Sequence, residues 1–242
     1  MSSFRFALES TPLPPEYSHI TRDQTLLGRC GKKIFELFCK VLFSVYCPLT
    51  VSGRENLLDS SYIFCSNHNS HMDSGVLMTA SGKGFKNFGM IAAKDYFFEN
   101  KIRKFFLNIL MNLIPVDRRS NRKTITEYLV ACREFVSKGQ RSIIIYPEGT
   151  RSKTGEIQPF KRGLAIVSVE LDIPVVPAYI EGTFKAMPKG RNLVKPGKIT
   201  ITIGEPVYPG DYLNEGDTHS HFDAYSKVTN ELEKRIRNLK DR

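Results

Sequence analysis

The chain has 242 residues, of which 41% are hydrophobic and 25% charged, which indicates one folded domain and argues against a disordered or fibrous chain. The formal net charge of +10 favours an anionic partner, such as nucleic acid, a membrane surface or a phosphorylated small molecule. The five cysteines form no Cys-x-x-Cys pair and lie among apolar residues, which indicates reduced thiols in a cytosolic setting and argues against a disulfide framework.

Residues 1–28 form a polar, Pro-rich segment without the apolar core of a signal peptide. Residues 29–48 predict an apolar and basic helix, in which lysines such as Lys32 stand beside phenylalanines such as Phe35. Charges interrupt this stretch, whereas a spanning helix needs about twenty largely uncharged residues. Two interpretations stay open: an amphipathic helix lying in a membrane interface, and a core helix with a charged rim.

Residues 49–242 alternate strand-like apolar runs with helix-like spacings. Strands are predicted at Leu49–Gly53, Tyr62–Ser66, Phe88–Ala93, Ile143–Tyr146, Val175–Ile180 and Ile199–Ile203. Helices are predicted over about Ser70–Thr79, Tyr96–Leu113, Ile125–Val136, Phe160–Leu171 and Phe222–Leu239. Pro177 predicts that its strand is an edge strand or contains a bulge. The alternation predicts a single α/β domain with a mostly parallel central sheet flanked by helices.

A histidine and an aspartate directly follow the second of these strands. His68 stands five residues before Asp73, which lies about one helical turn further on. This spacing lets the carboxylate orient and polarise the imidazole, so that the ring can take a proton from a hydroxyl. A lone His-Asp pair is more often structural, so other residues must support this interpretation.

Lys94 and Glu148 each follow another predicted strand, and the carboxyl ends of parallel strands share one edge of a sheet. Glu148 opens the turn Glu148–Arg151, where Gly149 frees backbone N–H groups and Arg151 presents a planar fork suited to phosphate. Arg118 follows another apolar run and adds positive charge. These residues predict one crevice that binds an anionic substrate.

Four blocks in this order resemble the PlsC-like glycerolipid acyltransferase family, the 1-acyl-sn-glycerol-3-phosphate acyltransferases. They are Asn67-His68 with Asp73, Val116-Asp117-Arg118, Tyr146–Ser152 and Ile173–Pro177, and the resemblance covers about residues 50–205. Tyr146 stands where the family usually has Phe. Each block alone is weak evidence, and the four in order are strong evidence.

The resemblance implies a glycerol-3-phosphate acyltransferase-like fold and transfer of a fatty acyl chain from acyl-CoA or acyl carrier protein to a lysophosphatidic acid hydroxyl. It makes His68 the general base and Asp73 its orienting partner. Glu148 would hold the glycerol part, and Arg151, with Lys94 and Arg118, the phosphate. Gly149 and Thr150 of the same turn would also bind substrate. The resemblance also implies direct transfer without an acyl-enzyme, which fits a chain with no Gly-x-Ser-x-Gly elbow. No metal or cofactor is implied. Many members of the family carry two hydrophobic amino-terminal helices as a membrane anchor, whereas this chain offers one broken stretch, so we expect peripheral or monotopic attachment to the cytoplasmic face of a membrane.

Other classes stay open. A transacylase, or an acyltransferase for glycerol 3-phosphate or another lyso-lipid, would use the same residues. A metallo-hydrolase would need His-x-His-x-Asp-His, and the spacing from His68 to Asp73 is off by one. A non-catalytic lipid-binding module would leave that pair idle. Nucleic acid is not expected as a partner, since the basic residues form no known module and Trp is absent.

Overall fold

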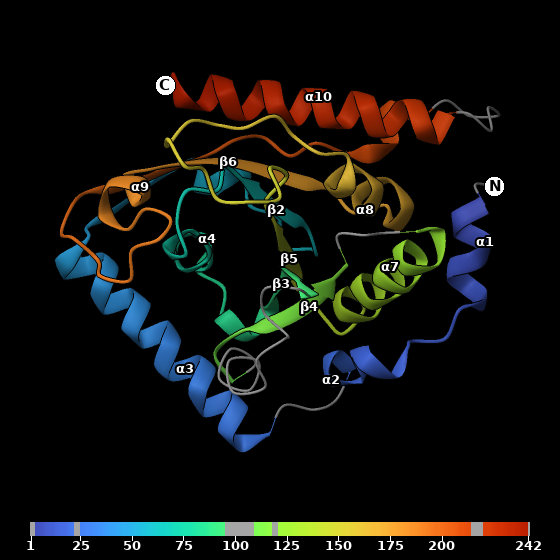
Figure 1. The fold of residues 1–242 in the computed structure, drawn as a ribbon, viewed down its shortest axis with the longest axis horizontal. Coiled ribbons are helices and arrows are strands. Elements are labelled where there is room, and N and C mark those ends of the chain that lie inside the picture. The colour runs from blue at the N-terminus through green and yellow to red at the C-terminus, as the bar shows by residue number, and fades with distance from the viewer. Residues whose placement is uncertain (1–2, 22–24, 95–108, 118–120, 214–219, 242) are drawn as a thin grey trace.

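The computed structural model describes residues 3–21, 25–94, 109–117, 121–213 and 220–241 (Figure 1). Seven strands within these ranges form one sheet in the order β1-β7-β6-β2-β5-β3-β4. They are β1 (Leu49–Ser52), β2 (Ile63–Ser66), β3 (Phe88–Ala93), β4 (Asn112–Val116), β5 (Ser142–Ile145), β6 (Val175–Glu181) and β7 (Ile199–Ile203). Every neighbouring pair is parallel except β6 with β7, so the predicted mostly parallel sheet is confirmed.

The central strands are apolar on both faces because helices cover both sides of the sheet. Ile143 and Ile145 point into one hydrophobic cluster, and Ile144 points into the other. Ile63 and Phe64 divide in the same way on the neighbouring strand. Two-sided burial explains why these runs are continuously apolar instead of alternating with polar residues.

Helices lie in two layers, one on each face of the sheet (Figure 1). The first layer contains α1 (Ser3–Ser10), α2 (Ser18–Thr21), α7 (Arg122–Val136), α8 (Gly163–Leu171) and α10 (Ser220–Lys240). The second contains α3 (Leu26–Val41), α4 (Met72–Ser81) and the short α9 (Thr183–Ala186). Short helical turns complete the order: η1 (Pro15–Tyr17), η2 (Leu42–Tyr46), η3 (Arg54–Asn56), η4 (Phe85–Asn87) and η5 (Pro209–Tyr212).

Three sequence predictions need correction. The helix predicted to reach Leu113 is wrong at its end, because Asn112–Val116 is the edge strand β4; residues 95–108 of that prediction lie outside the described ranges. Pro115 fits an edge strand, which has free backbone positions. Of the two alternatives stated for Pro177, the edge strand is wrong, because β6 lies between β2 and β7. The bulge is not contradicted: Val175 pairs with Val207 and Ala178 with Ile203, which leaves one extra residue between Ile203 and Val207. The helix predicted from Phe160 begins instead at Gly163.

The amino-terminal segment packs against α7 and the β4 edge, although the sequence showed only a polar, Pro-rich stretch. The Tyr17 hydroxyl donates to the Pro115 carbonyl at 3.1 Å, and His19 Nε2 lies 3.0 Å from the Leu113 carbonyl oxygen. Tyr17 is 2% exposed. This segment therefore covers the edge strand and satisfies carbonyl groups that an open edge leaves unpaired.

The helix α3 exposes several apolar side chains and buries two charged ones. Lys32 and Glu36 are buried at 4% and 8% exposure and face the protein, whereas Ile34 and Val41 are exposed at 67% and 55%. Soluble helices place the apolar stripe inward. The described helices contain none with the length and hydropathy that a membrane crossing requires.

Candidate active site

The His68-Asp73 pair is formed by the loop between β2 and α4. His68 Nδ1 lies 2.9 Å from Asp73 Oδ2, and that oxygen also accepts from the backbone N–H groups of Asn69 at 2.7 Å and Ser70 at 2.8 Å. Asp73 lies in the first turn of α4 and is fully buried. Three donors on one carboxylate oxygen fix the loop, so the five-residue spacing places the two side chains in contact.

The pair has the orientation that a general base needs. Because the carboxylate accepts, Nδ1 carries the proton and Nε2 presents its lone pair. Within the described residues no hydrogen bond involves Nε2, and 17% of the His68 side chain is exposed. The other carboxylate oxygen, Asp73 Oδ1, is buried and has no hydrogen-bond partner among the described residues.

The backbone around His68 is held from three directions. The His68 N–H donates to Glu148 Oε1 at 2.7 Å, and the Ser152 N–H donates to the His68 carbonyl at 2.7 Å. The neighbouring Asn67 amide pairs with Ile180 of β6, donating to its carbonyl at 2.9 Å and accepting from its N–H at 2.8 Å. The peptide that carries the imidazole is therefore fixed to strand β6 and to the loop after β5.

Glu148 is a buried carboxylate whose two oxygens bind two backbone segments. Oε1 accepts from His68, and Oε2 accepts from the Gln158 N–H at 3.0 Å. Burial raises the pKa of this carboxyl to about 7, against the lowering effect of the two N–H donors. Glu148 thus connects the His68 loop to residues 156–160. Each oxygen keeps a second lone pair, so the contact with a substrate hydroxyl stays a prediction.

Tyr146 stacks on the imidazole. The two ring centroids lie 3.8 Å apart with an interplanar angle of 8°. The Tyr146 hydroxyl lies 2.8 Å from Ser74 Oγ. The Ser74 hydroxyl in turn donates to the Met90 sulfur at 2.8 Å. Ser74 directly follows Asp73 in α4, so the same helix turn fixes the ring edge through Asp73 and the ring face through Tyr146.

The turn after Glu148 brings several cations together. Gly149 has a φ of +71°, and a Cβ atom there would lie 3.0 Å from Lys161 Nζ, so Lys161 lies against this glycine. Lys189 Nζ donates to Thr150 Oγ1 at 3.1 Å. The half-buried Arg151 has no hydrogen-bond or ion-pair partner among the described residues. Three cations around one glycine turn suit a phosphate group.

The remaining predicted phosphate ligands are placed differently. Lys94 follows β3, but its ammonium group binds Glu16 Oε1 at 2.8 Å and lies 5.6 Å from the centre of the Tyr17 ring. Arg118 lies outside the described residues. In the described part of the chain, no three His, Cys, Asp or Glu side chains lie close enough to hold a metal ion.

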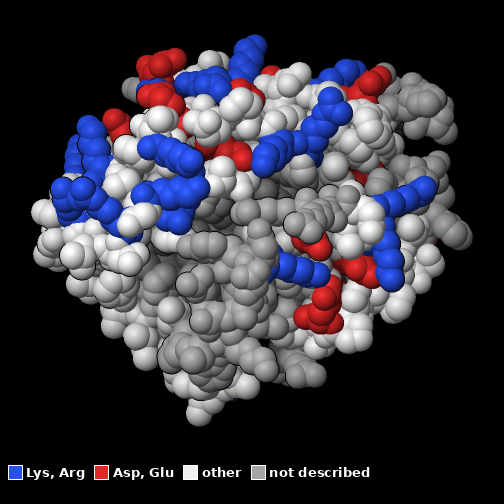
Figure 2. Space-filling view, viewed as in Figure 1, with Lys and Arg blue, Asp and Glu red and all other residues white. Residues whose placement is uncertain are grey.

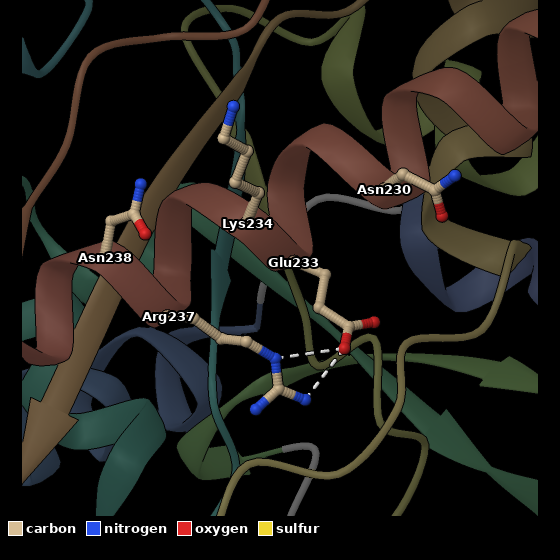
Figure 3. A pocket seen from close by; sticks show the side chains of 5 residues that line it. All are labelled: Asn230, Glu233, Lys234, Arg237 and Asn238. Atoms are coloured by element: carbon tan, nitrogen blue, oxygen red, sulfur yellow. Dashed lines mark hydrogen bonds and ion pairs between the residues drawn. The ribbon is translucent and has the colours of Figure 1, made fainter.

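A separate pocket lies on α10 (Figure 3). It is lined by Asn230, Glu233, Lys234, Arg237 and Asn238. Arg237 donates to Glu233 at 2.7 Å, and Glu233 also accepts from the Phe160 N–H at 3.0 Å. None of the predicted site residues lines this pocket. Its ion pair lies within α10, and the hydrogen bond from Phe160 connects α10 to the loop before α8.

Several residues of the site were not assigned a role from the sequence. Asn67 and Ser152 lie within the recognised blocks, but their backbone contacts depend on strands distant in the chain. The Tyr146 stack was signalled only by the substitution of Tyr for Phe. Lys189 gave no signal beyond its charge, because it lies 39 residues after Thr150, the residue it contacts.

Comparison with known proteins indicates the same family as the four motifs in the sequence. The sequence profile of the family described as Acyltransferase matches residues 48–181. A chloroplastic 1-acyl-sn-glycerol-3-phosphate acyltransferase from Brassica napus is 30% identical over 190 residues, covering 76% of this chain and 53% of that protein. A 1-acyl-sn-glycerol-3-phosphate acyltransferase from Bacillus subtilis is 29% identical over 205 residues, covering 84% of this chain and 94% of that protein.

The fold is also similar to a solved structure. The crystal structure of the 1-acyl-sn-glycerophosphate acyltransferase PlsC from Thermotoga maritima matches with a TM-score of 0.65 at 24% identity. The match covers 99% of this chain and 94% of that chain. The chain spans about half the length of the relatives from Brassica napus, Cocos nucifera and Arabidopsis thaliana.

Proposed function

The chain belongs to the acyltransferase family, and from this premise we propose that it transfers a fatty acyl chain to the sn-2 hydroxyl of 1-acylglycerol 3-phosphate, giving phosphatidic acid. The proposal is carried by the contact between His68 and Asp73 at 2.9 Å, which leaves Nε2 as an accessible base. The relatives that bear this enzyme name support the same acceptor.

In the proposed reaction, His68 Nε2 takes the proton of the acceptor hydroxyl as its oxygen attacks the thioester carbonyl carbon. Asp73 stabilises the imidazolium that forms. The C–O ester bond forms, the C–S bond breaks, and the imidazolium returns the proton to the departing thiol. Atoms and charges balance without a redox or metal step.

The acyl group passes directly between the substrates in this proposal. A covalent acyl-enzyme would need a reactive thiol or hydroxyl beside His68. Cys65 lies three residues before His68, but it is fully buried, and burial raises the pKa of its thiol well above the ordinary value. A thiol that stays protonated is a poor nucleophile, which supports direct attack by the acceptor.

The turn Gly149–Arg151 is the proposed phosphate site. Arg151 is half-buried and free of ion pairs among the described residues, while Lys161 and Lys189 lie against the same turn. A guanidinium group binds two phosphate oxygens at once, which orients the headgroup. Lys94 and Arg118 remain proposed contributors. The donor is acyl-CoA or acyl carrier protein, and no further cofactor is proposed.

Peripheral attachment to the cytoplasmic face of a membrane is part of this proposal. The exposed row on α3 and η2 includes Ile34, Val41 and Val45 at 67%, 55% and 77% exposure. Such a row fits the interface of a bilayer, where the acceptor resides. All five cysteines are free, which fits a reducing compartment. Complete loss of the protein from membranes in high-salt or carbonate washes, together with no measurable lipid binding, would reject the attachment.

A product assay tests the activity. The purified protein is given lysophosphatidic acid, glycerol 3-phosphate and neutral lyso-lipids as acceptors, with acyl-CoA, acyl carrier protein thioester and phospholipid as donors. We expect phosphatidic acid to form from a thioester donor. Its rate of formation should fall by about 10²- to 10⁴-fold in His68→Ala. Activity unchanged in His68→Ala would exclude the mechanism. Transfer only from phospholipid would identify a transacylase instead.

A further inference from the structure

The segment between α9 and β7 protrudes beside the carboxyl end of η2. Leu193, in the middle of this segment of sequence, is the most exposed large hydrophobic side chain of the described residues, at 83%. The Tyr46 hydroxyl donates to the Val194 carbonyl at 3.3 Å, and Cys47 Sγ donates to the Lys195 carbonyl at 3.5 Å. These bonds connect the segment to the end of the helix whose apolar row is exposed.

The same segment is basic and contains few acidic neighbours. Lys189, Arg191 and Lys195 are exposed, and no acidic residue occurs between Gly182 and Gly204. Figure 2 shows Lys and Arg side chains grouped at the left, over the α9 end of the molecule, above white surface. The exposed row of α3 also carries charge at its sides, because Arg29, Lys33 and Lys40 are exposed. A basic rim around an apolar surface is complementary to lipid headgroups above acyl chains.

We propose that the segment 187–198 is a second membrane-binding element, which inserts Leu193 into a bilayer surface while Arg191 and Lys195 bind anionic phospholipid headgroups. Together with the exposed row on α3, it gives the protein one membrane-binding face. Contacts through both the segment 187–198 and α3 would fix the orientation of the protein on the bilayer, whereas a contact through α3 alone would let the protein rotate about that helix.

The segment also reaches the candidate active site. Lys189 Nζ donates to Thr150 Oγ1 at 3.1 Å, in the turn proposed to bind phosphate. A bilayer bound by this face therefore lies next to the position where a lipid phosphate would bind. This part of the inference rests on the proposed function. A lipid acceptor would then enter from the membrane without full transfer into water.

Vesicle binding tests the surface independently of catalysis. The full chain is sedimented with vesicles of phosphatidylcholine alone and of phosphatidylcholine with phosphatidylglycerol. Arg191→Glu/Lys195→Glu is compared with Lys227→Glu/Lys234→Glu, an equal charge change at exposed positions of α10. We expect the first pair to lose at least about twenty-fold in partitioning to anionic vesicles, and the control pair less than about threefold.

The apolar contribution has its own matched pair. Leu193→Asp is compared with Phe222→Asp, which changes a side chain of 68% exposure on α10. Leu193→Asp should reduce binding to both kinds of vesicle by about tenfold or more, whereas Phe222→Asp should not. Circular dichroism confirms that each variant is folded. Equal binding by Leu193→Asp and wild type would overturn the insertion of this segment.

Activity on acceptor dispersed in detergent separates the two proposals. Leu193→Asp should keep this activity within about twofold of wild type, because detergent presents the acceptor without a bilayer. If no variant is active but vesicle binding depends on Leu193, the membrane surface stands and the proposed reaction fails. If the wild type does not bind vesicles but self-associates as its concentration rises, this face binds a second copy and the membrane proposal is wrong.

Discussion

The ring of Tyr146 lies against the imidazole of His68, with centroids 3.8 Å apart and planes within 8° of each other. An aromatic face attracts a cation, so this contact becomes stronger when His68 is protonated. Asp73 and Glu148 are the acidic groups that face the same residue, through its ring edge and its backbone N–H. Tyr146 is therefore a positioning residue that favours the imidazolium.

Replacement of Tyr146 by Leu should lower kcat by between about twofold and thirtyfold, with little change in either KM. The reason is that the imidazolium formed during proton transfer loses its stacked partner. Tyr146→Phe keeps the ring and should restore most of the activity. A Leu variant with the wild-type kcat would show that the ring only fills space.

Asp73→Asn should reduce kcat by about a hundredfold or more, with little effect on acceptor KM. The amide cannot accept three hydrogen bonds through a charged oxygen, so the Nδ1–H tautomer is no longer favoured. Steady-state kinetics over a range of acceptor concentrations measure both parameters. Asp223→Asn on the exposed side of α10 is the control, and normal turnover of Asp73→Asn would contradict its orienting role.

Arg151→Ala should raise the KM for lysophosphatidic acid by about ten- to hundredfold, because one charged hydrogen-bonded contact to the phosphate is lost. Arg151→Lys keeps the charge but not the planar guanidinium fork, so its KM for lysophosphatidic acid should lie between the values of the wild type and of Arg151→Ala. The exposed neighbour Lys153→Ala should remain close to wild type. An effect confined to the acyl donor KM would show that this residue binds the other substrate.

Glu148 should make the fold less stable as the pH rises. Burial raises its folded pKa to about 7 from an ordinary value of 4.5. In this pH range the folded state binds a proton that the unfolded state releases, so the contribution to stability is full below about 4.5 and decreases up to about 7. Urea unfolding at several pH values measures the slope.

The Glu148→Gln variant separates this effect from other carboxyl groups. The slope between pH 4.5 and 7 should become smaller, because the amide does not titrate. Gln accepts through one oxygen only, so the N–H of either His68 or Gln158 loses its partner, and kcat should fall about tenfold or more. An unchanged pH slope would show that Glu148 ionises in the fold as it does in water.

The His68-Asp73 pair was predictable from the sequence because its two residues are close together in the chain. His68 and Asp73 are five residues apart, and the strand before them ends where the helix after them begins. The central strands were equally evident, since two-sided burial makes them continuously apolar. The order of four motifs indicated the family, although no motif fixed where Lys94 or Arg118 binds.

The parts that were mispredicted depend on distant partners. Asn112–Val116 continues an apolar run with helical spacing, and it is a strand because β3 and the amino-terminal segment offer partners from elsewhere in the chain. Pro177 suggested an edge or a bulge, and the edge was wrong because β2 and β7, which are distant in the chain, pair with β6 on its two sides. The stack of Tyr146 on His68 is equally non-local, because β2 and β5 are neighbours only in the folded sheet.

The double anchoring of the His68 peptide, through its N–H to Glu148 and its carbonyl to Ser152, makes the base a stationary part of the scaffold. Chemical steps then require the acceptor to move to the imidazole, because the imidazole has no freedom to follow it. Relatives that use different acceptors can therefore differ in the walls around this loop while retaining the loop itself. Engineering of acceptor choice should begin at those walls.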